Sequence, residues 1–374
     1  MNFSASFTLA LSTTAIFLFS GCNEGAPVDT PTSTETDLAT LGEALFFDTN
    51  LSEPTGQSCA SCHTAASGFA DPDSNFSTSE GIIAGQFGTR NTPTAAYAAF
   101  VPAFAYDIVE GLYTGGQFLD GRASLLEDQA KGPPLNPVEM HNPNKASYVA
   151  KVAAASYAPL VKKVFGLNVF DDPETGYEKI ARAIAAYERT KVFSPFSSKF
   201  DFYIKGKATL SPQEMEGLTL FEGKAQCVAC HPTRPTEDGT PGLFTDFTYD
   251  NLGVPKNRAI PAYANDENFI DIGLAGNSNV IADGRATENR GKFKVATLRN
   301  IALTGPYMHN GVFKTLKEVV SFYNTRDTNI SRWDVAEIPE TVNHTELGNL
   351  GLSDKEEDAI VAFLQTLTDG YGVK

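Results

Sequence analysis

The chain has 374 residues and a formal net charge of -16. Because nucleic-acid phosphates require a basic protein face, this acidic balance argues against nucleic-acid binding and favours a partner with a basic contact surface. The length is sufficient for two domains with separate cores.

Residues 1–22 have the pattern of a secretory signal. Apolar residues between Phe7 and Phe19 precede Cys22, as in bacterial lipoprotein cleavage sites. Acylation of Cys22 would anchor the mature chain to the periplasmic or outer surface of a Gram-negative bacterium. Cleavage without a lipid is the alternative, because no Lys or Arg precedes the apolar run and Phe19 stands where such sites carry aliphatic residues. The run is shorter than the ~20 residues that a spanning helix needs.

Residues 23–37 consist mainly of Thr, Ser, Pro and acidic residues, a composition that predicts a flexible tether. We expect the first helix to begin after Asp37, which is a good N-cap residue. Apolar residues then follow on one helical face. They are Leu38, Leu41, Leu45 and Phe46.

This helix leads into Cys59-Ala60-Ser61-Cys62-His63, whose spacing is that of a covalently attached c-type haem. Each cysteine can form a thioether bond to a haem vinyl group. The histidine that follows is placed to ligate the iron. The sequence therefore predicts a first haem at this motif.

The segment 91–142 is rich in Gly, Pro and Asn, which predicts a loop-rich wall around the cofactor. Helical spacing then returns in a stripe that closes the first domain. This stripe is Tyr177, Ile180, Ile184 and Tyr187. We place the domain boundary near Gly206, which gives an N-terminal haem domain at 38–205 and a C-terminal haem domain at 206–374.

The second half repeats the arrangement of the first. Ser211, Pro212 and Glu214 form a capping box with proline at the first helical position. The predicted helix leads into a second motif, Cys227-Val228-Ala229-Cys230-His231. A structural zinc site is the rival interpretation, but pooling both motifs into one zinc site would leave the two adjacent histidines unexplained. Two covalently bound haems are therefore predicted.

Residues 245–292 lack a clear period, and a loop of this length in a compact domain is usually functional. Capping boxes at Thr315 with Glu318 and at Ser353 with Glu356 predict two closing helices. Their apolar stripes are Leu316, Val319, Val320 and Tyr323, and Ile360, Phe363, Leu364 and Leu367. Because strand signals are few, we predict an all-α protein with two cytochrome c-like domains and a loop-rich interface.

The sixth ligand of each iron decides its role. An electron-transfer haem needs a strong sixth ligand, whereas a haem that reacts with peroxide needs an open position. Outside the initiator, the methionines are Met140, Met215 and Met308. Met308 is the best candidate ligand among them, and packing in the core is its alternative role.

At this point the chain resembles the bacterial di-haem cytochrome c peroxidases and their MauG-like relatives, over about residues 38–369. The similarity rests on seven motifs: Leu45-Phe46-Phe47-Asp48, Arg90-Asn91-Thr92-Pro93-Thr94, Phe118-Leu119-Asp120-Gly121-Arg122-Ala123, Asn136-Pro137-Val138-Glu139-Met140, Thr297-Leu298-Arg299-Asn300, Leu303-Thr304-Gly305-Pro306-Tyr307-Met308-His309-Asn310-Gly311 and Thr315-Leu316-Lys317-Glu318-Val319-Val320. The resemblance implies an enzyme that reacts with hydrogen peroxide at the N-terminal haem and transfers electrons through the C-terminal haem.

The resemblance gives Tyr323 a role that its residue type alone would not. Ordinary peroxidases of this family carry Met at the matching position, whereas the MauG-like branch carries a Tyr that ligates the second haem together with the equivalent of His231. A phenolate favours higher oxidation states, and a thioether favours Fe(II). Without the resemblance, a tyrosine on an amphipathic helix is interpreted as packing.

Three residues are carried over as the peroxide pocket. Glu139 matches the distal acid and base of the family, Gln129 a distal polar residue and Pro133 a distal wall residue. From its sequence context alone, Glu139 would be a solvated loop carboxylate. No histidine lies between residues 65 and 90 to block the first haem, so we expect its iron to have an open position at rest. His141 is the one nearby histidine that could instead block it.

The resemblance also implies a Ca²⁺ ion between the haem domains. Its ligands would be the Asn91 side chain and the backbone carbonyls of Thr304 and Pro306, a set of oxygen donors suited to Ca²⁺. From sequence alone these are turn residues. Arg122 and Arg299 are candidates to pair with haem propionates, and surface cations are the equal alternative.

One position departs from the family. Leu119 stands where the family usually has Trp between the haems, and Leu cannot be oxidised to relay an electron hole. Phe118, Tyr113 and Tyr307 are candidate substitutes. The single tryptophan, Trp333, lies in a polar segment and is interpreted as structural.

The leading hypothesis is a MauG-like peroxidase that oxidises a protein partner. A conventional cytochrome c peroxidase, which takes electrons from a small electron-carrier protein to remove peroxide, is the first alternative. A non-catalytic electron-transfer protein, which requires both irons to be six-coordinate, is the second.

Overall fold

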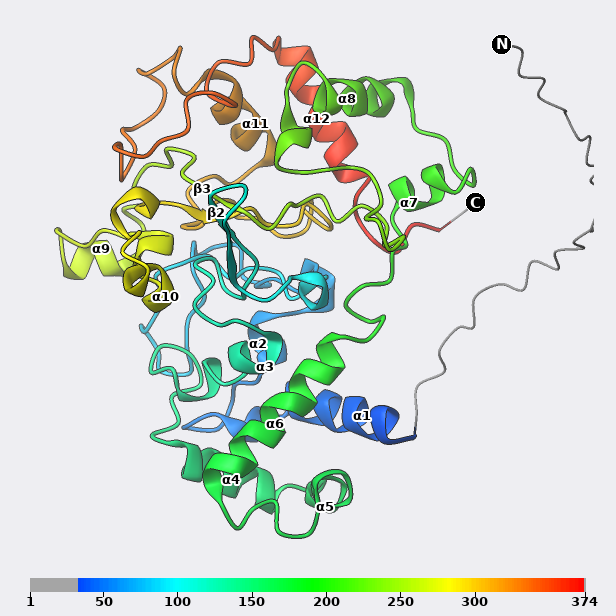
Figure 1. The fold of residues 1–374 in the computed structure, drawn as a ribbon, viewed down its shortest axis with the longest axis vertical. Helices are drawn as coiled ribbons and strands as arrows, with labels where there is room; N and C mark the ends of the chain where they lie inside the picture. The colour runs from blue at the N-terminus through cyan, green and yellow to red at the C-terminus, as the bar shows by residue number, and fades with distance from the viewer. Residues whose placement is uncertain (1–32, 373–374) are drawn as a thin grey trace, which may run out of the picture.

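The computed structural model describes residues 33–372, so Cys22 and the predicted signal lie outside the described residues. The chain is mostly helical and has two halves, one above the other in Figure 1, each with its own hydrophobic core. Short strands and loops lie between them.

The first half contains six α-helices and four 3-10 helices within the described residues. They are α1 (Ser33–Phe47), η1 (Thr49–Leu51), α2 (Cys59–Cys62), η2 (Ala65–Ser67), η3 (Ala98–Phe100), α3 (Leu126–Gln129), η4 (Pro133–Leu135), α4 (Lys145–Ala154), α5 (Ala158–Phe165) and α6 (Pro173–Glu188). The remaining helices are α7 (Lys199–Ile204), α8 (Pro212–Glu222), η5 (Cys227–Ala229), α9 (Pro261–Asn265), η6 (Gly273–Gly276), α10 (Ser278–Ala282), η7 (Thr287–Asn289), α11 (Leu316–Thr325) and α12 (Asp354–Gln365).

Helix α1 begins at Ser33, before the predicted N-cap at Asp37. The prediction that residues 33–37 belong to the tether is therefore wrong. Glu35 lies in the first turn, where a negative charge interacts favourably with the helix dipole. Asp37 instead forms an ion pair with Lys163 of α5. The predicted apolar face is confirmed, because Leu41, Leu45 and Phe46 are buried and Leu38 packs against the same core.

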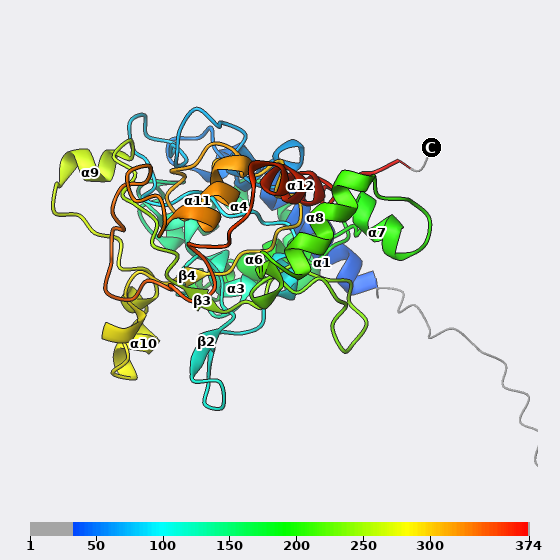
Figure 2. The ribbon, with the colours of Figure 1, turned by 90° about the horizontal axis from the view of Figure 1, so that it is seen from above.

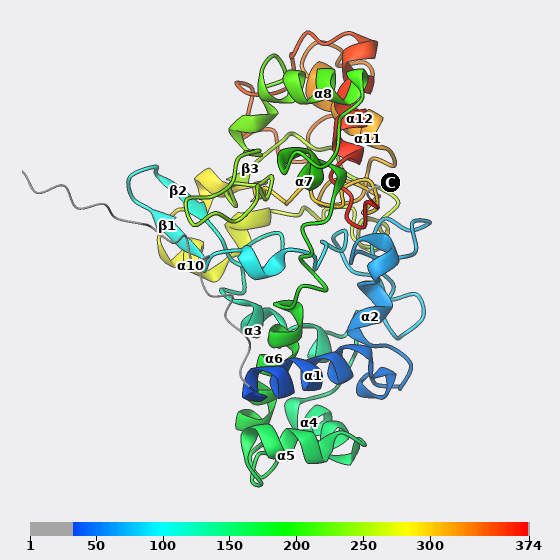
Figure 3. The same cartoon turned by 90° about the vertical axis from the view of Figure 1, so that its right-hand side faces the viewer.

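The two halves share one type of helix crossing. Helix α1 crosses α6 at Gly42, where a Cβ atom would collide with the backbone carbonyl of Ala183. Helix α8 crosses α12 at Gly217, where a Cβ atom would meet the carbonyl of Ala359 in the same way. Glycine is required at both crossings because the backbones approach too closely for any side chain. Figure 3 shows one crossing at each end of the molecule.

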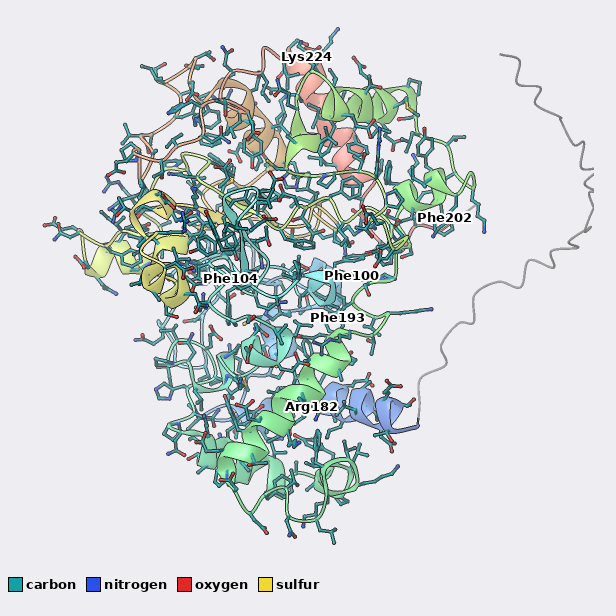
Figure 4. The ribbon with its side chains drawn as sticks, in the orientation of Figure 1. Phe100, Phe104, Arg182, Phe193, Phe202 and Lys224 are labelled. Atoms are coloured by element: carbon teal, nitrogen blue, oxygen red, sulfur yellow. The ribbon has the colours of Figure 1, made fainter. Side chains whose placement is uncertain are left out.

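Each half has a core built largely of aromatic and aliphatic side chains. Phe193, labelled in Figure 4, is fully buried in the first core and contacts the rings of Phe69 and Phe46 at centroid distances of 4.2 and 5.4 Å. Phe196 still packs against this core, but Phe200 belongs to the second. The change of core thus comes a few residues before the predicted boundary at 205/206, because α7 packs with the second half.

Buried ion pairs join segments that are distant in sequence. Arg299 donates two hydrogen bonds of 3.0 Å to the carboxylate of Asp201 in α7, and both side chains are almost fully buried. Arg90 of the first half binds Asp271 of the second through two hydrogen bonds of 2.6 and 2.7 Å. Such pairs fix the relative position of their segments, because either charge alone would be costly to bury.

All three predicted capping boxes are confirmed. Ser211, Thr315 and Ser353 each accept a hydrogen bond from the backbone of the glutamate three residues later. Each glutamate in turn accepts one from the backbone N–H of the capping residue. The start of each helix is therefore determined locally.

Four short strands were not predicted. β1 (Ala105–Asp107) pairs antiparallel with β2 (Leu112–Thr114), with Tyr106 opposite Tyr113. β3 (Tyr249–Asp250) pairs antiparallel with β4 (Phe293–Lys294). The β1–β2 hairpin projects from the body of the molecule (Figures 2 and 3). In the range 33–372, no helix has both the length and the apolar character needed to cross a membrane.

Candidate functional site

The first motif lies on the short helix α2 and the turn that follows it. The Nδ1 atom of His63 lies 2.9 Å from the backbone carbonyl oxygen of Phe69. Since a carbonyl oxygen only accepts, Nδ1 carries the proton and Nε2 keeps its lone pair. Burial lowers the pKa of His63, which also favours the neutral imidazole. A neutral imidazole oriented through its second nitrogen is the form that ligates iron.

The second motif reproduces this arrangement. The Nδ1 atom of His231 lies 2.7 Å from the carbonyl oxygen of Phe244, and burial lowers the pKa of His231. Phe69 and Phe244 both have positive φ, 60° and 54°, at equivalent places in the two halves. The same unusual turn thus presents a carbonyl to each histidine.

A cavity of about 330 Å³ adjoins the second motif. Its lining includes Cys227, Cys230, His231 and Tyr323, so that both cysteines, the histidine and the tyrosine face one space. This donor set and this apolar space fit a covalently attached haem.

A pooled zinc site does not fit the structure. Within residues 33–372, no group of three or more Cys, His, Asp or Glu side chains is arranged to hold a metal ion. Burial raises the pKa of Cys59 and of Cys227 to about 12, whereas zinc is bound by thiolates. The four motif cysteines form no disulfide with one another and remain free to form thioether bonds.

Tyr323 lies in α11 and is half-buried at the cavity. Its hydroxyl makes no hydrogen bond to any residue between 33 and 372. Burial raises the pKa of Tyr323 well above the usual value for a phenol, and negative charge at Cys227 or Cys230 would raise it further. The phenol therefore lies beside the second motif, as the resemblance implies, and needs a nearby cation to ionise.

Met308 also lines this cavity, so the geometry alone keeps it as a second possible donor. It packs against the second core and has a positive φ of 70°. Met215 packs against the same core but does not line the cavity, and Met140 is buried in the first core.

Glu139 lies beside the first motif. Burial raises the pKa of Cys59 and of Cys62 to about 12, and the charge of Glu139 adds to the rise at both thiols. Burial also raises the pKa of Glu139 itself, against the opposing effects of Asn136 and Arg122. Asn136 donates a hydrogen bond of 2.7 Å to its Oε1 atom. The half-buried Glu139 carboxyl is therefore fixed by a hydrogen bond, whereas its local sequence suggests a solvated loop residue.

Gln129 and Pro133 lie on the same segment as Glu139. Gln129 ends α3, Pro133 begins η4, and the backbone N–H of Met140 donates to the carbonyl of Pro133 at 3.3 Å. The segment is thus folded back on itself, although no hydrogen bond joins Gln129 to Glu139. His141 is exposed and has a positive φ of 58°.

Asn91 is brought to one of the two backbone carbonyls named with it, that of Pro306. Its side-chain amide lies 2.5 Å from the carbonyl oxygen of Pro306 and 3.4 Å from that of Met308. Thr304 lines the same cavity. Because an amide can be turned to present its oxygen, this cluster of oxygen atoms is compatible with a hard cation.

The two arginines differ from each other. Arg299 is not a surface cation, because it is almost fully buried and its guanidinium is occupied by Asp201 and the carbonyl of Gly242. Arg122 is exposed, pairs with Asp120 at 2.9 Å and lies over the ring of Phe118 at 3.6 Å.

Leu119 and Phe118 both line the cavity of the second motif although they belong to the first half. The carbonyl of Leu119 accepts a hydrogen bond of 2.9 Å from the backbone of Lys294. Trp333 lies elsewhere, against Phe313 and Phe322 in the second core, in agreement with a structural role.

Two buried groups were missed by the sequence analysis. Glu188, at the end of α6, has no partner for its Oε2 atom among residues 33–372, and burial raises its pKa to about 8. Its charge is also felt at Cys59. His309 lines the cavity, and its ring stacks on Phe293 at a centroid distance of 3.7 Å. Its Nε2 atom has no hydrogen-bond partner in the part of the chain that the structure describes. The only signal for Glu188 was a charged residue directly after an apolar stripe.

Known proteins match most of this chain. A family model described as di-haem cytochrome c peroxidase matches residues 36–209. The methylamine utilization protein MauG of Paracoccus denitrificans is 40% identical over 348 residues, which cover 89% of this chain and 88% of that protein. Cytochrome c551 peroxidase of Nitrosomonas europaea is 34% identical over 367 residues, which cover 96% of this chain and 90% of that protein.

A solved structure has the same fold. The crystal structure of the diheme peroxidase BthA from Burkholderia thailandensis matches with a TM-score of 0.83 and 36% sequence identity, covering 91% of this chain and 87% of that one.

Proposed function

Because this chain belongs to the di-haem cytochrome c peroxidase family, we propose that it is a MauG-like peroxidase with two unequal haem domains. As a member of the family it is a peroxide-dependent oxidoreductase with two c-type haems. In this proposal, residues 38–205 bind the haem that reacts with hydrogen peroxide, and residues 206–374 bind the haem that passes electrons.

The observation that carries the proposal is the position of Tyr323. It lines the same cavity as Cys227, Cys230 and His231, with its hydroxyl not engaged by any described residue. If Tyr323 and His231 both held a haem in this cavity, the phenol oxygen would stabilise its higher oxidation states. This property suits an enzyme that stores oxidising equivalents for a protein partner, as MauG-like enzymes are expected to do.

Glu139 supplies the proton chemistry at the first site. Cys59, Cys62 and His63 would hold a haem at the first site, and that haem would supply the redox chemistry for the reduction of peroxide. The Glu139 carboxylate accepts a proton from the hydroxyl of incoming peroxide and returns it to the departing oxygen. Asn136 holds the carboxylate through Oε1, which leaves Oε2 for the proton. Gln129 and Pro133 complete the distal wall.

The reducing substrate has two candidates. The first is a protein with a basic contact surface that matches the net charge of -16. The second is a small electron-carrier protein, as in a conventional cytochrome c peroxidase; the presence of Leu119 in place of an oxidisable residue supports this alternative. A purely electron-transferring protein is disfavoured, because the enzymes in this family react with peroxide.

Two further parts of the proposal concern the surroundings of the sites. Asn91, Thr304 and Pro306 would hold a Ca²⁺ ion, supported by the approach of the Asn91 amide to the Pro306 carbonyl. Export to the periplasm or outer surface of a Gram-negative bacterium, with a lipid anchor at Cys22, would follow from the N-terminal sequence.

Peroxide titration of the purified ferric holoprotein tests the proposal. We expect visible and EPR spectra to show one haem with an open position and one six-coordinate haem before peroxide is added. Peroxide should then oxidise the protein, and mass spectrometry should find oxidised residues in a candidate partner only when peroxide is present. Two six-coordinate low-spin haems that do not react with peroxide would overturn it.

A further inference from the structure

A third hydrophobic cluster lies apart from the two main cores. It consists of Tyr113, Tyr249, Leu274 and Val280, with Phe104 and Tyr106 packed against it. Four of these six side chains are aromatic, and three are phenols. They come from the β1–β2 hairpin and from the second half, and Phe104 lies at the base of the hairpin (Figure 4).

The aromatic rings form a continuous series from the hairpin inward. Tyr106 and Tyr113 are 4.9 Å apart between ring centroids. Tyr113 stacks on Phe104 at 5.2 Å with an interplanar angle of 8°, and Phe104 meets Tyr249 edge to face at 6.0 Å. Electrons pass readily between rings in van der Waals contact, so this series offers a path from one end to the other.

The inner end of the series adjoins the loop at residues 115–121 of the first half. The hydroxyl of Tyr249 donates a hydrogen bond of 2.5 Å to the carbonyl of Gly115. At Gly121, a Cβ atom would collide with the same hydroxyl and with the ring of Phe104. This loop carries Leu119, and Asp250 directly follows Tyr249; both residues line the cavity of the second motif.

Tyr113 is the member of the series best equipped for oxidation. It is 2% exposed, and its hydroxyl donates a hydrogen bond of 2.6 Å to Oδ2 of Asp283. A phenol loses an electron easily only if its proton can leave at the same time, and the carboxylate provides the acceptor. The guanidinium of Arg285 lies 4.1 Å from the ring of Tyr106, and its charge also acts on Tyr113. The two phenols differ in their proton acceptor, because the hydroxyl of Tyr106 makes no hydrogen bond to any residue between 33 and 372.

We propose that Tyr113 is a one-electron oxidation site of this enzyme, connected to the haem region through Phe104 and Tyr249 and to the surface through Tyr106. This inference rests on the proposed peroxidase function. Tyr113 would lose one electron to the peroxide-oxidised enzyme while its phenolic proton passes to Oδ2 of Asp283, leaving a neutral tyrosyl radical and a carboxylic acid. Hydrogen peroxide is the oxidant: one molecule takes two electrons and two protons and gives two waters, so the enzyme keeps one oxidising equivalent after Tyr113 has lost its electron, until a second electron follows by the same path.

The cycle closes when an electron from the reducing substrate reaches Tyr113 through Tyr106, and the proton returns from Asp283. Such a path does not need an oxidisable residue at position 119. It would therefore compensate for Leu119 by bypassing it at Tyr249.

The test uses the full holoprotein treated with one equivalent of hydrogen peroxide without reductant, frozen rapidly and measured by EPR. We expect a tyrosyl signal that narrows when the protein contains ring-deuterated tyrosine. Tyr113→Phe should remove this signal, because the packing is kept but the proton and the easily oxidised ring are lost. Asp283→Asn should weaken it.

Tyr157→Phe is the matched control. The Tyr157 hydroxyl also donates a hydrogen bond of 2.6 Å to a carboxylate, that of Asp48, but Tyr157 makes no ring contact with another described aromatic residue. This variant should keep the signal. An unchanged signal in Tyr113→Phe, or no tyrosyl signal in a wild-type protein that consumes peroxide, would overturn the inference and leave the peroxidase function standing. A wild-type holoprotein that does not consume peroxide would overturn both.

Discussion

The turns at residues 117–123 and 307–313 have nearly the same backbone, but the helices that follow them carry different side chains. In the first half, Gln117 pairs with Ala123 across a turn in which Phe118 and Gly121 have φ values of 63° and 66°. In the second half, Tyr307 pairs with Phe313 across a turn in which Met308 and Gly311 have φ values of 70° and 62°. A helix follows each turn, beginning at Leu126 and at Leu316.

The helices that follow differ in length. Helix α3 ends at Gln129, and Pro133 and Pro134 follow in η4. Helix α11 continues to Thr325 and carries Tyr323. Tyr323 follows the first residue of α11, Leu316, by as many positions as Pro133 follows the first residue of α3, Leu126. Proline lacks the N–H and the shape that a helix interior requires. One scaffold thus places a proline, which has no donor atom, in the first half where the second half has a phenol.

The largest expected effect concerns Glu139, the acid and base that we propose for the first site. Glu139→Gln should lower kcat/KM for peroxide by about 10²- to 10⁴-fold, because general acid–base catalysis is lost. In the wild type, activity should rise with pH through the raised pKa of Glu139, since the carboxylate is the active base, and this rise should vanish in the variant. Steady-state peroxide assays across pH measure both.

Glu237→Gln is the control for this change, because Glu237 is an exposed loop carboxylate in the second half. It should leave kcat/KM unchanged. A Glu139→Gln variant with near wild-type activity would show that the two sites do not differ in the way we propose.

A second difference is the buried arginine of the second half. The backbone N–H of Arg299 donates a hydrogen bond to the hydroxyl of Thr297. At the matching place in the first half, the backbone N–H of Ala96 donates to the hydroxyl of Thr94, so an alanine stands where the second half has the arginine. Asp201→Asn should destabilise the fold by about 3–5 kcal/mol, because it leaves the Arg299 charge buried without its partner. Chemical unfolding of the holoprotein measures this.

The same pair predicts a pH dependence. Burial alone would raise the pKa of Asp201, but the hydrogen bonds and charge of Arg299 outweigh it and lower the pKa. The stabilisation is therefore present above the unfolded-state pKa and is lost as the pH falls through the lower folded-state value. Asp201→Asn should show a weaker loss of stability on acidification than the wild type. Equal acid sensitivity of the two proteins would contradict this reasoning.

A third difference between the two halves is the proposed Tyr323 ligand of the second haem, which a redox titration can test. Tyr323→Met should raise the midpoint potential of the second haem by roughly a tenth of a volt, because a neutral thioether replaces an anionic oxygen donor. Redox titration followed by visible spectroscopy measures the shift. Met308→Leu is the control, since Met308 lines the same cavity. A shift in Met308→Leu alone would identify the methionine as the ligand.

The smallest expected effect concerns the helix crossing that both halves share, at Gly42 and at Gly217. Gly42→Ala and Gly217→Ala should each cost about 1–3 kcal/mol of stability, because the added methyl group overlaps a backbone carbonyl at the helix crossing. Gly276→Ala is the control, as its Cβ would lie 3.6 Å from the nearest atom. Unfolding midpoints that are lowered in only one of the two crossing variants would show that the halves are not built alike.

Much of this architecture could be predicted because its signals are local. The capping boxes, the apolar stripes and the first helix, apart from its starting residue, follow from residues within a few turns of one another. The β1–β2 hairpin could not be recognised, because its strands have three residues each and are stabilised by aromatic contacts to the second half. Glu139 could not be distinguished from a solvated loop carboxylate without knowing that the chain folds back over it.

The sequence by itself determined the two motifs that we propose as haem attachment sites, since the cysteines and the histidine of each motif are neighbours in the chain. Only the tertiary structure decided which distant side chains share those spaces: Tyr323 and Met308 at the second motif, Glu139 at the first, and Asn91 against Pro306. The physical reason is that covalent spacing and helix capping act over a few residues. Cavities and buried charges depend on segments that meet only when the whole chain has packed.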